Sequence, residues 1–175
     1  MEIMKAIIML VVILVAFPLV MNGQETEYNV ETESVSTHVD KILNGPITKE
    51  GLKQMPYKLW FNSNYKTYRV NTDLLKDAKK KNIKNLKVLA FMGTWCHDSN
   101  REIPRLMRIM DDMGIADQLE LYALDVDKTS LKGKEKGFDI KNTPTIIFYL
   151  NGEEVTRVIE EPEGSFEEEL VRILK

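Results

Sequence analysis

Cys96 is the only cysteine in this 175-residue chain, and its neighbours are of types that could support chemistry. The stretch FMGTWCHDSN places the thiol between Trp95 and His97, with Ser99 three positions beyond it. A single cysteine excludes an internal disulfide framework and a multi-cysteine zinc site. It leaves a nucleophilic role, in which the thiolate attacks a sulfur atom of another molecule.

The residues around Cys96 predict that it lies where a buried strand passes into a helix. Residues 88–92 (VLAFM) form a continuous apolar run of strand length, which Gly93 interrupts. Apolar side chains then recur at helical spacing up to Met113, and Gly114 provides a C-terminal stop. The unpaired N–H groups and the positive dipole at a helix N-terminus favour a thiolate there.

Other polar groups near the thiol leave its electrostatics open. A protonated His97 would stabilise a Cys96 thiolate and Asp98 would oppose it, so His97 is either a tuning group or an ordinary surface residue. A metal cluster of these three residues is disfavoured, because adjacent residues on a helix point apart. Asp125 and Asp127 are better explained as caps of the turn after the second strand than as an acid/base pair. We therefore expect no metal site.

The rest of the chain predicts a small α/β domain. Strands separated by helices should pair in parallel, whereas Asn151-Gly152 is a hairpin signal that should make the last two strands antiparallel. Ser165 and Glu168 form a capping box in front of a C-terminal helix. We expect a mixed four-stranded sheet flanked by helices. Its predicted strands are residues 88–92, 119–126, 145–150 and 153–159, and its predicted helices begin near Asn71, Cys96 and Ser165.

Residues 1–23 differ in composition from the rest of the chain and predict a secretory signal peptide. A lysine precedes an apolar run from Ala6 to Val20, which is shorter than the roughly 20 residues of a transmembrane helix. Cleavage after Gly23 is expected, with an uncleaved anchor as the alternative, and a lipoprotein anchor is excluded because no cysteine lies there. The chain is therefore expected to be exported, periplasmic or secreted, without stable membrane insertion after cleavage.

Residues 24–69 predict an N-terminal extension, a linker plus a short helix, ahead of a domain at residues 70–175. Thr48 is a plausible N-cap of this helix, and Pro56 would kink it or split it in two. His38, in the linker, is expected to be an ordinary surface residue. An aromatic cluster is expected to dock the extension onto the domain, with a wall of a substrate groove as the alternative. The cluster consists of Trp60, Phe61, Tyr65 and Tyr68.

The stretch WCHDS at the strand-to-helix junction resembles the W-C-x-x-C motif of the thioredoxin family, with serine replacing the second cysteine. Pro104, eight residues after Cys96, matches a helix-kinking proline of that family. The stretch NTPTIIFYLNGEEVTRVI resembles the family's segment in which a cis-proline precedes a strand and its hairpin. The resemblance covers about residues 70–175 and implies a thioredoxin-like three-layer sandwich. It is nearest to exported bacterial members that carry an extra N-terminal segment.

The resemblance assigns roles to individual residues. Cys96 corresponds to the attacking thiolate, and Trp95 corresponds to the tryptophan beside it. Thr143 and Pro144 correspond to the cis-proline turn, which faces the thiol and pairs with substrate backbone. These two residues, together with Trp95 and His97, are the expected substrate-binding residues.

Two departures from the family's pattern concern the second half of an exchange cycle. Ser99 stands in place of the cysteine that resolves a mixed disulfide, so it could only donate a hydrogen bond to the Cys96 thiolate. Ala90 stands where dithiol members usually carry a buried aspartate that moves protons. The resemblance therefore implies a monothiol, a thiol–disulfide oxidoreductase without its resolving cysteine. It would form a mixed disulfide at Cys96 and need no cofactor.

The expected partners are protein thiols or disulfides, or a low-molecular-weight thiol. Nucleic acid is excluded, since the net charge of −3 offers no basic surplus to neutralise phosphates. Two alternatives remain. One is a redox-inactive binding module that holds extended peptides against Trp95, Thr143 and Pro144. The other is a metal-handling protein, which would need ligands in addition to Cys96.

Overall fold

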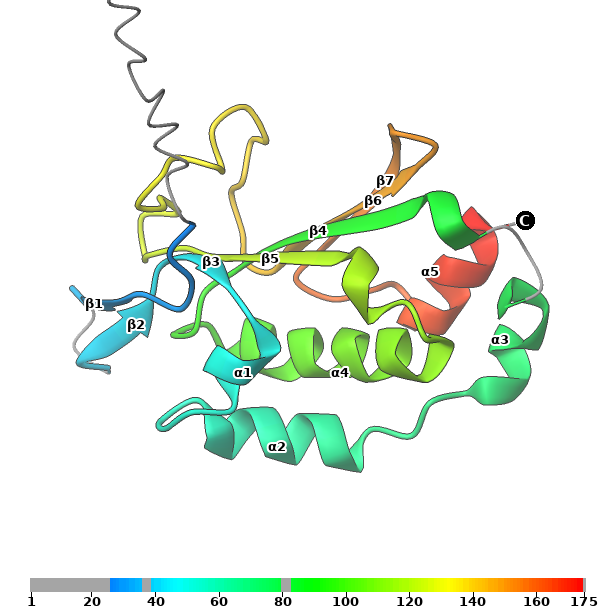
Figure 1. Ribbon diagram of the computed structural model, residues 1–175, viewed down its shortest axis with the longest axis horizontal. Coiled ribbons are helices and arrows are strands. Elements are labelled where there is room, and N and C mark those ends of the chain that lie inside the picture. Colours follow the sequence, from blue (N-terminus) through cyan, green and yellow to red (C-terminus); the bar gives the residue numbers. More distant parts are fainter. Residues whose placement is uncertain (1–25, 36–38, 80–82, 175) are drawn as a thin grey trace, which may run out of the picture.

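A five-stranded mixed sheet forms the centre of the computed structural model, which describes residues 26–35, 39–79 and 83–174 (Figure 1). The predicted signal peptide at residues 1–23 and the predicted surface residue His38 lie outside these residues. The strand order is β3-β5-β4-β6-β7, with β4 parallel to β5 and the other neighbours antiparallel. The strands are β3 (Gly45–Ile47), β4 (Leu86–Met92), β5 (Leu119–Ala123), β6 (Thr145–Leu150) and β7 (Glu153–Ile159).

The central strand β4 is buried on both faces, as its continuous apolar run predicts. Val88 and Met92 belong to the main core cluster on the helical side, whereas Leu89 and Phe91 belong to a smaller cluster on the other side. The alternation follows from the period of two along a strand. The expected α/β class, a mixed sheet flanked by helices, is confirmed.

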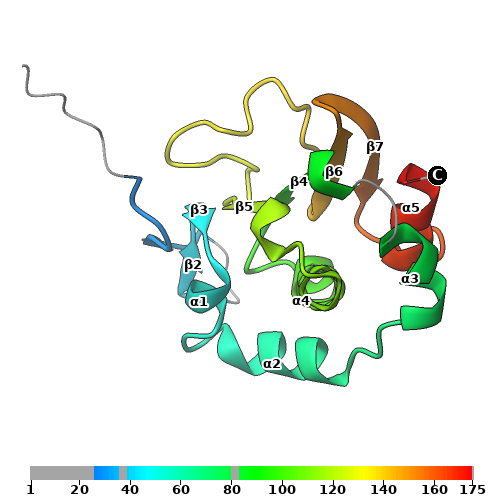
Figure 2. The ribbon, with the colours of Figure 1, turned by 45° about the vertical axis from the view of Figure 1, so that its right-hand side comes forward.

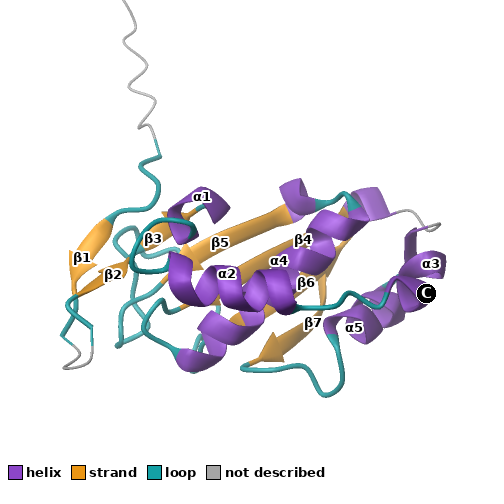
Figure 3. Ribbon diagram, turned by 90° about the horizontal axis from the view of Figure 1, so that it is seen from below, coloured by secondary structure: helices purple, strands orange, loops and turns teal. Residues whose placement is uncertain are grey.

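Helix α4 (His97–Met113) covers one face of the sheet, and α2 (Lys58–Thr67) lies on the outer side of α4 (Figure 2). Ile103, Leu106 and Met110 of α4 are fully buried in the main core cluster. Helices α3 (Thr72–Lys79) and α5 (Phe166–Ile173) pack together at the far end of this layer (Figure 3).

The other face of the sheet is covered by the connector between β5 and β6. Residues 128–138 of this connector have only turns and irregular backbone. Phe138 and Ile140 of the connector pack against the smaller core cluster. The Phe138 ring centroid lies 5.1 Å from that of Phe91. The side chains of Phe138 and Ile140 thus cover part of this face without a helix in the connector.

The N-terminal extension is part of the fold. Its strand β3 pairs with β5 and adds one strand to the four that the sequence predicted. Its short strands β1 (Glu31–Glu33) and β2 (Lys41–Leu43) form a separate antiparallel pair. The predicted helix is split at Pro56, as anticipated, into α1 (Lys49–Leu52) and α2. The predicted docking role of the aromatic cluster is confirmed. Phe61 is fully buried, and Trp60, Tyr65 and Tyr68 pack against the main core.

Several local signals have the structure that the sequence predicted. Asn151 and Gly152 have φ angles of 55° and 87°, as a tight hairpin turn requires. Ser165 and Glu168 make both hydrogen bonds of a capping box. Gly114 ends α4 in the left-handed conformation, with a φ of 72°. Within the described residues, no helix combines the length and apolar character that crossing a membrane requires.

Candidate functional site

Cys96 occupies the N-cap position of α4, directly after the loop that leaves β4. Its backbone is extended, and its N–H donates to the carbonyl oxygen of Gly93 at 3.0 Å. Its carbonyl accepts the bond from Asn100 at 3.0 Å that begins the helix. The thiol is partly exposed and makes no disulfide. The backbone therefore places the sulfur at the positive end of α4.

The cis-proline turn faces this thiol. The Thr143–Pro144 peptide bond is cis, as the resemblance implied, and both residues are buried. The Cys96 Sγ lies 3.0 Å from the carbonyl oxygen of Thr143, to which the thiol donates a hydrogen bond. The Pro144 carbonyl oxygen accepts a bond of 2.8 Å from Glu160 N–H, which joins this turn to the end of β7. Residues 47 positions apart in the sequence thus meet at one site.

Ser99 is fully buried one turn into α4. Its hydroxyl oxygen accepts a hydrogen bond of 3.2 Å from the backbone N–H of Gly93. Among the described residues, the Ser99 hydroxyl makes this hydrogen bond with Gly93 and makes none with Cys96. Ser99 therefore ties the helix to the loop that carries the thiol.

Trp95 is fixed beside the site by its indole nitrogen, which donates to the Leu124 carbonyl oxygen at 2.9 Å. A Cβ atom at Gly93 would lie 2.5 Å from the indole ring, so this ring position requires glycine. The ammonium group of Lys128 lies 4.9 Å from the ring centroid, within cation–π range. The Trp95 ring is thus fixed in position, with the ammonium group of Lys128 over it.

The structure shows how the charges next to Cys96 are paired. The His97 side chain is 89% exposed, and its Nδ1 lies 3.8 Å from Asp98 Oδ1. The same carboxylate oxygen forms an ion pair of 2.8 Å with the guanidinium of Arg101. This guanidinium also forms ion pairs with Glu102 and Glu161. The hydrogen bond with Glu102, aided by its charge and that of Asp98, raises the pKa of Arg101. Asp98 is therefore balanced mainly by Arg101.

The extension reaches the site through contacts that the sequence did not indicate. The Leu43 N–H donates to the buried Thr94 hydroxyl at 3.2 Å, two residues before the thiol. The Asn64 amide donates to the Asn100 carbonyl oxygen at 3.0 Å in the first turns of α4. No local pattern marks Thr94 as an acceptor, because its partner lies 51 residues away.

Asp125 and Asp127 are the remaining candidates for acid/base chemistry, and Asp127 is exposed. Asp125 caps the turn after β5, accepting bonds from the N–H and hydroxyl of Thr129, as predicted. Across the part of the chain that is described, no three His, Cys, Asp or Glu side chains are arranged to hold a metal ion.

A family model settles the relationship. The model described as thioredoxin matches residues 67–175, which is more than half of the chain and includes the whole site. The chain belongs to the thioredoxin family. The resemblance inferred from WCHDS and the cis-proline segment is therefore confirmed at the level of the family and its fold.

Two curated thioredoxins are similar over part of their length. Thioredoxin-2 of Saccharomyces cerevisiae is 34% identical over 74 residues, covering 42% of this chain and 66% of the relative. The thioredoxin of Malassezia sympodialis is 32% identical over 72 residues, covering 41% of this chain and 66% of the relative. The chain thus spans just under two thirds of either relative.

Solved thioredoxin structures resemble the chain more distantly. Oxidised thioredoxin O2 of Arabidopsis thaliana has a TM-score of 0.41 at 16% identity, covering 60% of this chain and 86% of its own. Fasciola hepatica thioredoxin has a TM-score of 0.39 at 22% identity, covering 59% and 90% respectively.

Proposed function

We propose that this thioredoxin-family protein carries out thiol–disulfide exchange with Cys96 as its only thiol. The observation that carries the proposal is the position of the Cys96 sulfur, partly exposed at the N-terminus of α4 and 3.0 Å from the Thr143 carbonyl oxygen. The helix N-terminus stabilises negative charge on the sulfur. The adjacent turn offers backbone groups to an extended substrate.

The proposed reaction leaves the number of disulfides unchanged. The Cys96 thiolate attacks one sulfur of a partner disulfide, a Cys96–partner disulfide forms, and the other partner sulfur leaves as a thiolate. A thiolate of the partner, or of a small external thiol, then attacks the partner's sulfur in this mixed disulfide. Cys96 leaves as a thiolate and is ready for another cycle. Ser99 takes no part, because a hydroxyl cannot resolve a disulfide.

The proposed substrate-binding residues come from the loop before α4, from its first residue and from the cis-proline turn. Trp95 supplies an apolar ring next to Cys96 in the chain, and the buried turn of Thr143 and Pro144 lies within hydrogen-bonding distance of the thiol. The exposed His97 imidazole is available to a partner that covers the site. These features suit a protein thiol or disulfide presented on an extended segment, or a small thiol.

Alkylation of Cys96 by iodoacetamide tests the first step. An ordinary thiol with a pKa of about 8.5 is only about 3% ionised at pH 7. We expect Cys96 to react about fivefold or more faster at pH 7 than a cysteine in an unstructured peptide. An equal or slower rate would contradict the proposal.

Covalent trapping tests the second step. Incubation with a peptide disulfide should give a long-lived Cys96–peptide adduct by mass spectrometry, and the Cys96→Ala variant should give none. Ser99→Cys supplies the missing second thiol, so it should release the peptide and leave a disulfide between Cys96 and the introduced cysteine. Failure of the parent chain to form the adduct, although its fold is intact, would refute thiol exchange.

A second candidate function is supported by the hydrogen bonds of the site. The Cys96 thiol donates to Thr143 and the Ser99 hydroxyl accepts from Gly93, so both groups also serve to join elements. In this alternative the residues Trp95, Thr143 and Pro144 bind extended peptides without reacting. Cys96→Ser distinguishes the two functions. Unchanged peptide affinity, with no adduct in the parent chain, would favour the binding module.

We also propose that the protein acts outside the cytoplasm, with bacterial export as the expected route. The support is the apolar run from Ala6 to Val20 behind a single lysine at residue 5. Cell fractionation and intact mass test this proposal. A mature chain beginning at Gln24 in the exported fraction is expected, and an unprocessed cytoplasmic chain would contradict it.

A further inference from the structure

The connector between β5 and β6 presents a basic surface that begins at the ring of Trp95. Its residues 128–138 carry four lysines and a single acidic side chain, Glu135. The lysines are Lys128, Lys132, Lys134 and Lys136, of which the last three are exposed. We refer to these lysines and the exposed Leu131 as the connector surface.

The lysine charges are not balanced within the part of the chain that the structure describes. None of the four forms an ion pair there, whereas Lys141, a few residues further on, pairs with Asp139 at 3.1 Å. The Glu135 carboxylate accepts hydrogen bonds from the backbone N–H and the hydroxyl of Ser130. The connector surface is therefore positive, although the whole chain has a net charge of −3.

A strained turn fixes Lys128 beside the thiol site. Its φ of 63° is a conformation that residues other than glycine, asparagine and aspartate rarely adopt. The turn is held because the Asp125 carboxylate accepts hydrogen bonds from the N–H and the hydroxyl of Thr129. The Lys128 ammonium donates to a backbone carbonyl of the same turn at 2.9 Å and lies 4.9 Å from the Trp95 ring centroid. Its charge thus lies next to the residue that precedes Cys96.

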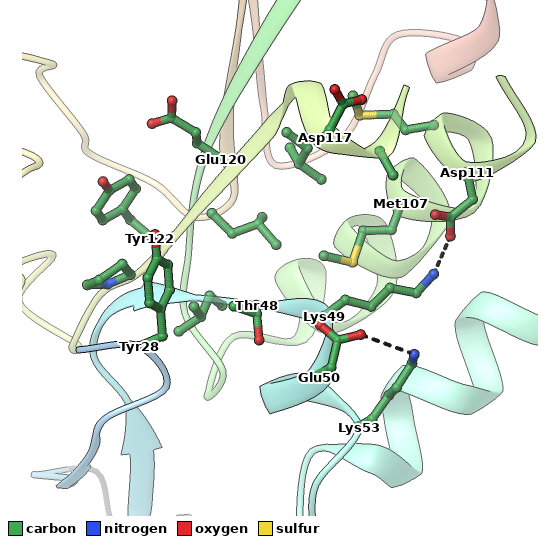
Figure 4. A pocket seen from close by; sticks show the side chains of 16 residues that line it. Tyr28, Thr48, Lys49, Glu50, Lys53, Met107, Asp111, Asp117, Glu120 and Tyr122 are labelled. Atoms are coloured by element: carbon green, nitrogen blue, oxygen red, sulfur yellow. Dashed lines mark hydrogen bonds and ion pairs between the residues drawn. The ribbon is translucent and has the colours of Figure 1, made fainter. Parts of the chain in front are cut away.

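The N-terminal extension holds the rest of the connector surface in place. The side chain of Asn44, which is 5% exposed, accepts the backbone N–H of Leu131 at 2.9 Å. The Lys134 ammonium lies 5.4 Å from the ring centroid of Tyr122, which lies beside Tyr28 of the extension (Figure 4). The Leu131 side chain remains 56% exposed. A fixed apolar group therefore lies among the lysines, which suits an interface with a peptide better than a site for a free ion.

We propose that the connector surface binds an acidic segment of the partner protein, next to the partner cysteine that exchanges with Cys96. A carboxylate of this segment pairs with Lys128, and its further acidic side chains lie near Lys132 and Lys134. An apolar side chain of the segment covers Leu131. The biological role of this surface rests on the proposed exchange function, but binding of the segment can be measured without any reaction at Cys96.

Two peptides without cysteine test the binding. The acidic probe is acetyl-Glu-Glu-Leu-Ser-Glu-Glu-amide, and acetyl-Lys-Lys-Leu-Ser-Lys-Lys-amide matches it in length and apolar content. We expect the acidic peptide to give saturable NMR shifts of the Lys128 amide and the Trp95 indole N–H of the full chain, at a Kd of about 1 mM or below. The affinity should fall as salt is added. Equal affinity for the two peptides, or no shift at either group, would overturn the proposal.

Inorganic phosphate separates a peptide site from a general anion site. Phosphate should bind at least about fivefold more weakly than the acidic peptide, because it has no apolar group to cover Leu131. Phosphate binding as tight as that of the peptide would identify a general anion site and overturn the assignment.

Variants locate the charge. Lys128→Asn removes the ammonium group but keeps a residue that tolerates this backbone conformation, so it should weaken binding of the acidic peptide about two- to fivefold. Lys128→Arg keeps the charge and should retain the affinity. Asp127→Asn removes an exposed opposing charge next to Lys128 in the chain and should strengthen binding up to about twofold.

A matched control lies at the opposite end of β4. Lys87→Gln also removes one exposed lysine charge, but about 17 Å along the strand from Met92, and it should have no effect. Unchanged affinity in Lys128→Asn, or a loss that Lys87→Gln reproduces, would overturn the assignment to Lys128.

Disulfide-linked dimers of the same peptides, with cysteine in place of serine, separate this proposal from the exchange function. The Cys96 thiolate displaces one peptide as its thiolate and retains the other in a mixed disulfide. Each rate is divided by the rate with 2-mercaptoethanol, which corrects for the reactivity of the peptide itself. We expect the acidic dimer to react about fivefold or more faster than the basic dimer.

The outcomes of this experiment are distinct for the two proposals. Equal corrected rates would overturn the connector surface and leave the exchange function intact. Binding of the acidic serine peptide, without an adduct from either dimer, would refute exchange and support the connector surface.

Discussion

At the level of single residues, the ion pair between Arg101 and Asp98 is expected to limit the effect of the Asp98 charge on the thiol. Both residues lie in the first turns of α4, and their ion pair of 2.8 Å places a positive charge on the carboxylate that is nearest to Cys96 in the sequence. Arg101→Gln should leave Asp98 uncompensated and disfavour the thiolate. We expect iodoacetamide to react about two- to fivefold more slowly at pH 7.

A double variant and a matched control make this prediction specific. Asp98→Asn in the Arg101→Gln background should restore the rate, because it removes the charge that Arg101 balances. Arg105→Gln also removes one arginine from Glu102, to which Arg105 donates at 2.9 Å, but it does not contact Asp98. A similar loss of rate in Arg105→Gln, or no rescue in the double variant, would show that the effect runs through Glu102 and the helix.

The sequence was sufficient to predict where the reactive residue Cys96 lies in the fold, but not the direction in which each neighbouring side chain points. The position of Cys96 follows from an apolar strand, a glycine and a helical repeat, all of which are local. The partner of Ser99 does not, because the letters WCHDS do not say which way a hydroxyl at the fifth position of the motif points. In the structure it faces Gly93, a contact set by how α4 packs on β4.

At the level of elements, Thr94 couples the extension to the loop that carries the thiol. Its hydroxyl accepts the Leu43 N–H at a buried position at the end of β2. Thr94→Val keeps the shape but removes the acceptor, which leaves a buried donor unsatisfied. We expect the free energy of unfolding to fall by about 1–3 kcal/mol, measured by urea denaturation.

Thr94→Ser keeps the hydroxyl and serves as the control. Hydrogen exchange of the Leu43 amide should accelerate in Thr94→Val and change much less in Thr94→Ser. Equal stability of parent and Thr94→Val, with unchanged exchange at Leu43, would show that water or another group satisfies this amide in the variant.

The elements themselves divide into those with local signals and those without. Helix caps, the Asn151-Gly152 hairpin and the apolar runs were sufficient to predict β4, α4, β6, β7 and α5, because each signal lies within its element. Strand β3 was not predicted. Its sequence, Gly45-Pro46-Ile47, has the residues of a loop, and proline is tolerated in strands only at a sheet edge. Its pairing with β5 depends on residues more than 70 positions away.

At the level of the whole molecule, the extension completes the core of the domain. Leu43, Leu52 and Phe61 are 0–2% exposed within the main core cluster, and α2 packs along α4. Burying each such side chain contributes about 1.5–3 kcal/mol. Domains of this size have a total stability of only about 5–15 kcal/mol. Losing all three contributions therefore removes a large part of the total.

This comparison predicts the behaviour of a fragment that retains only the family-matched residues, 67–175. Without the extension, the fragment loses strand β3, which pairs with β5. It also exposes Met107, Met110 and Leu121, which lie next to residues 46–50 of the extension. We expect it to unfold at a urea midpoint well below that of a chain beginning at residue 26, or to aggregate. A fragment as stable as the longer chain would show that the extension is an appendage.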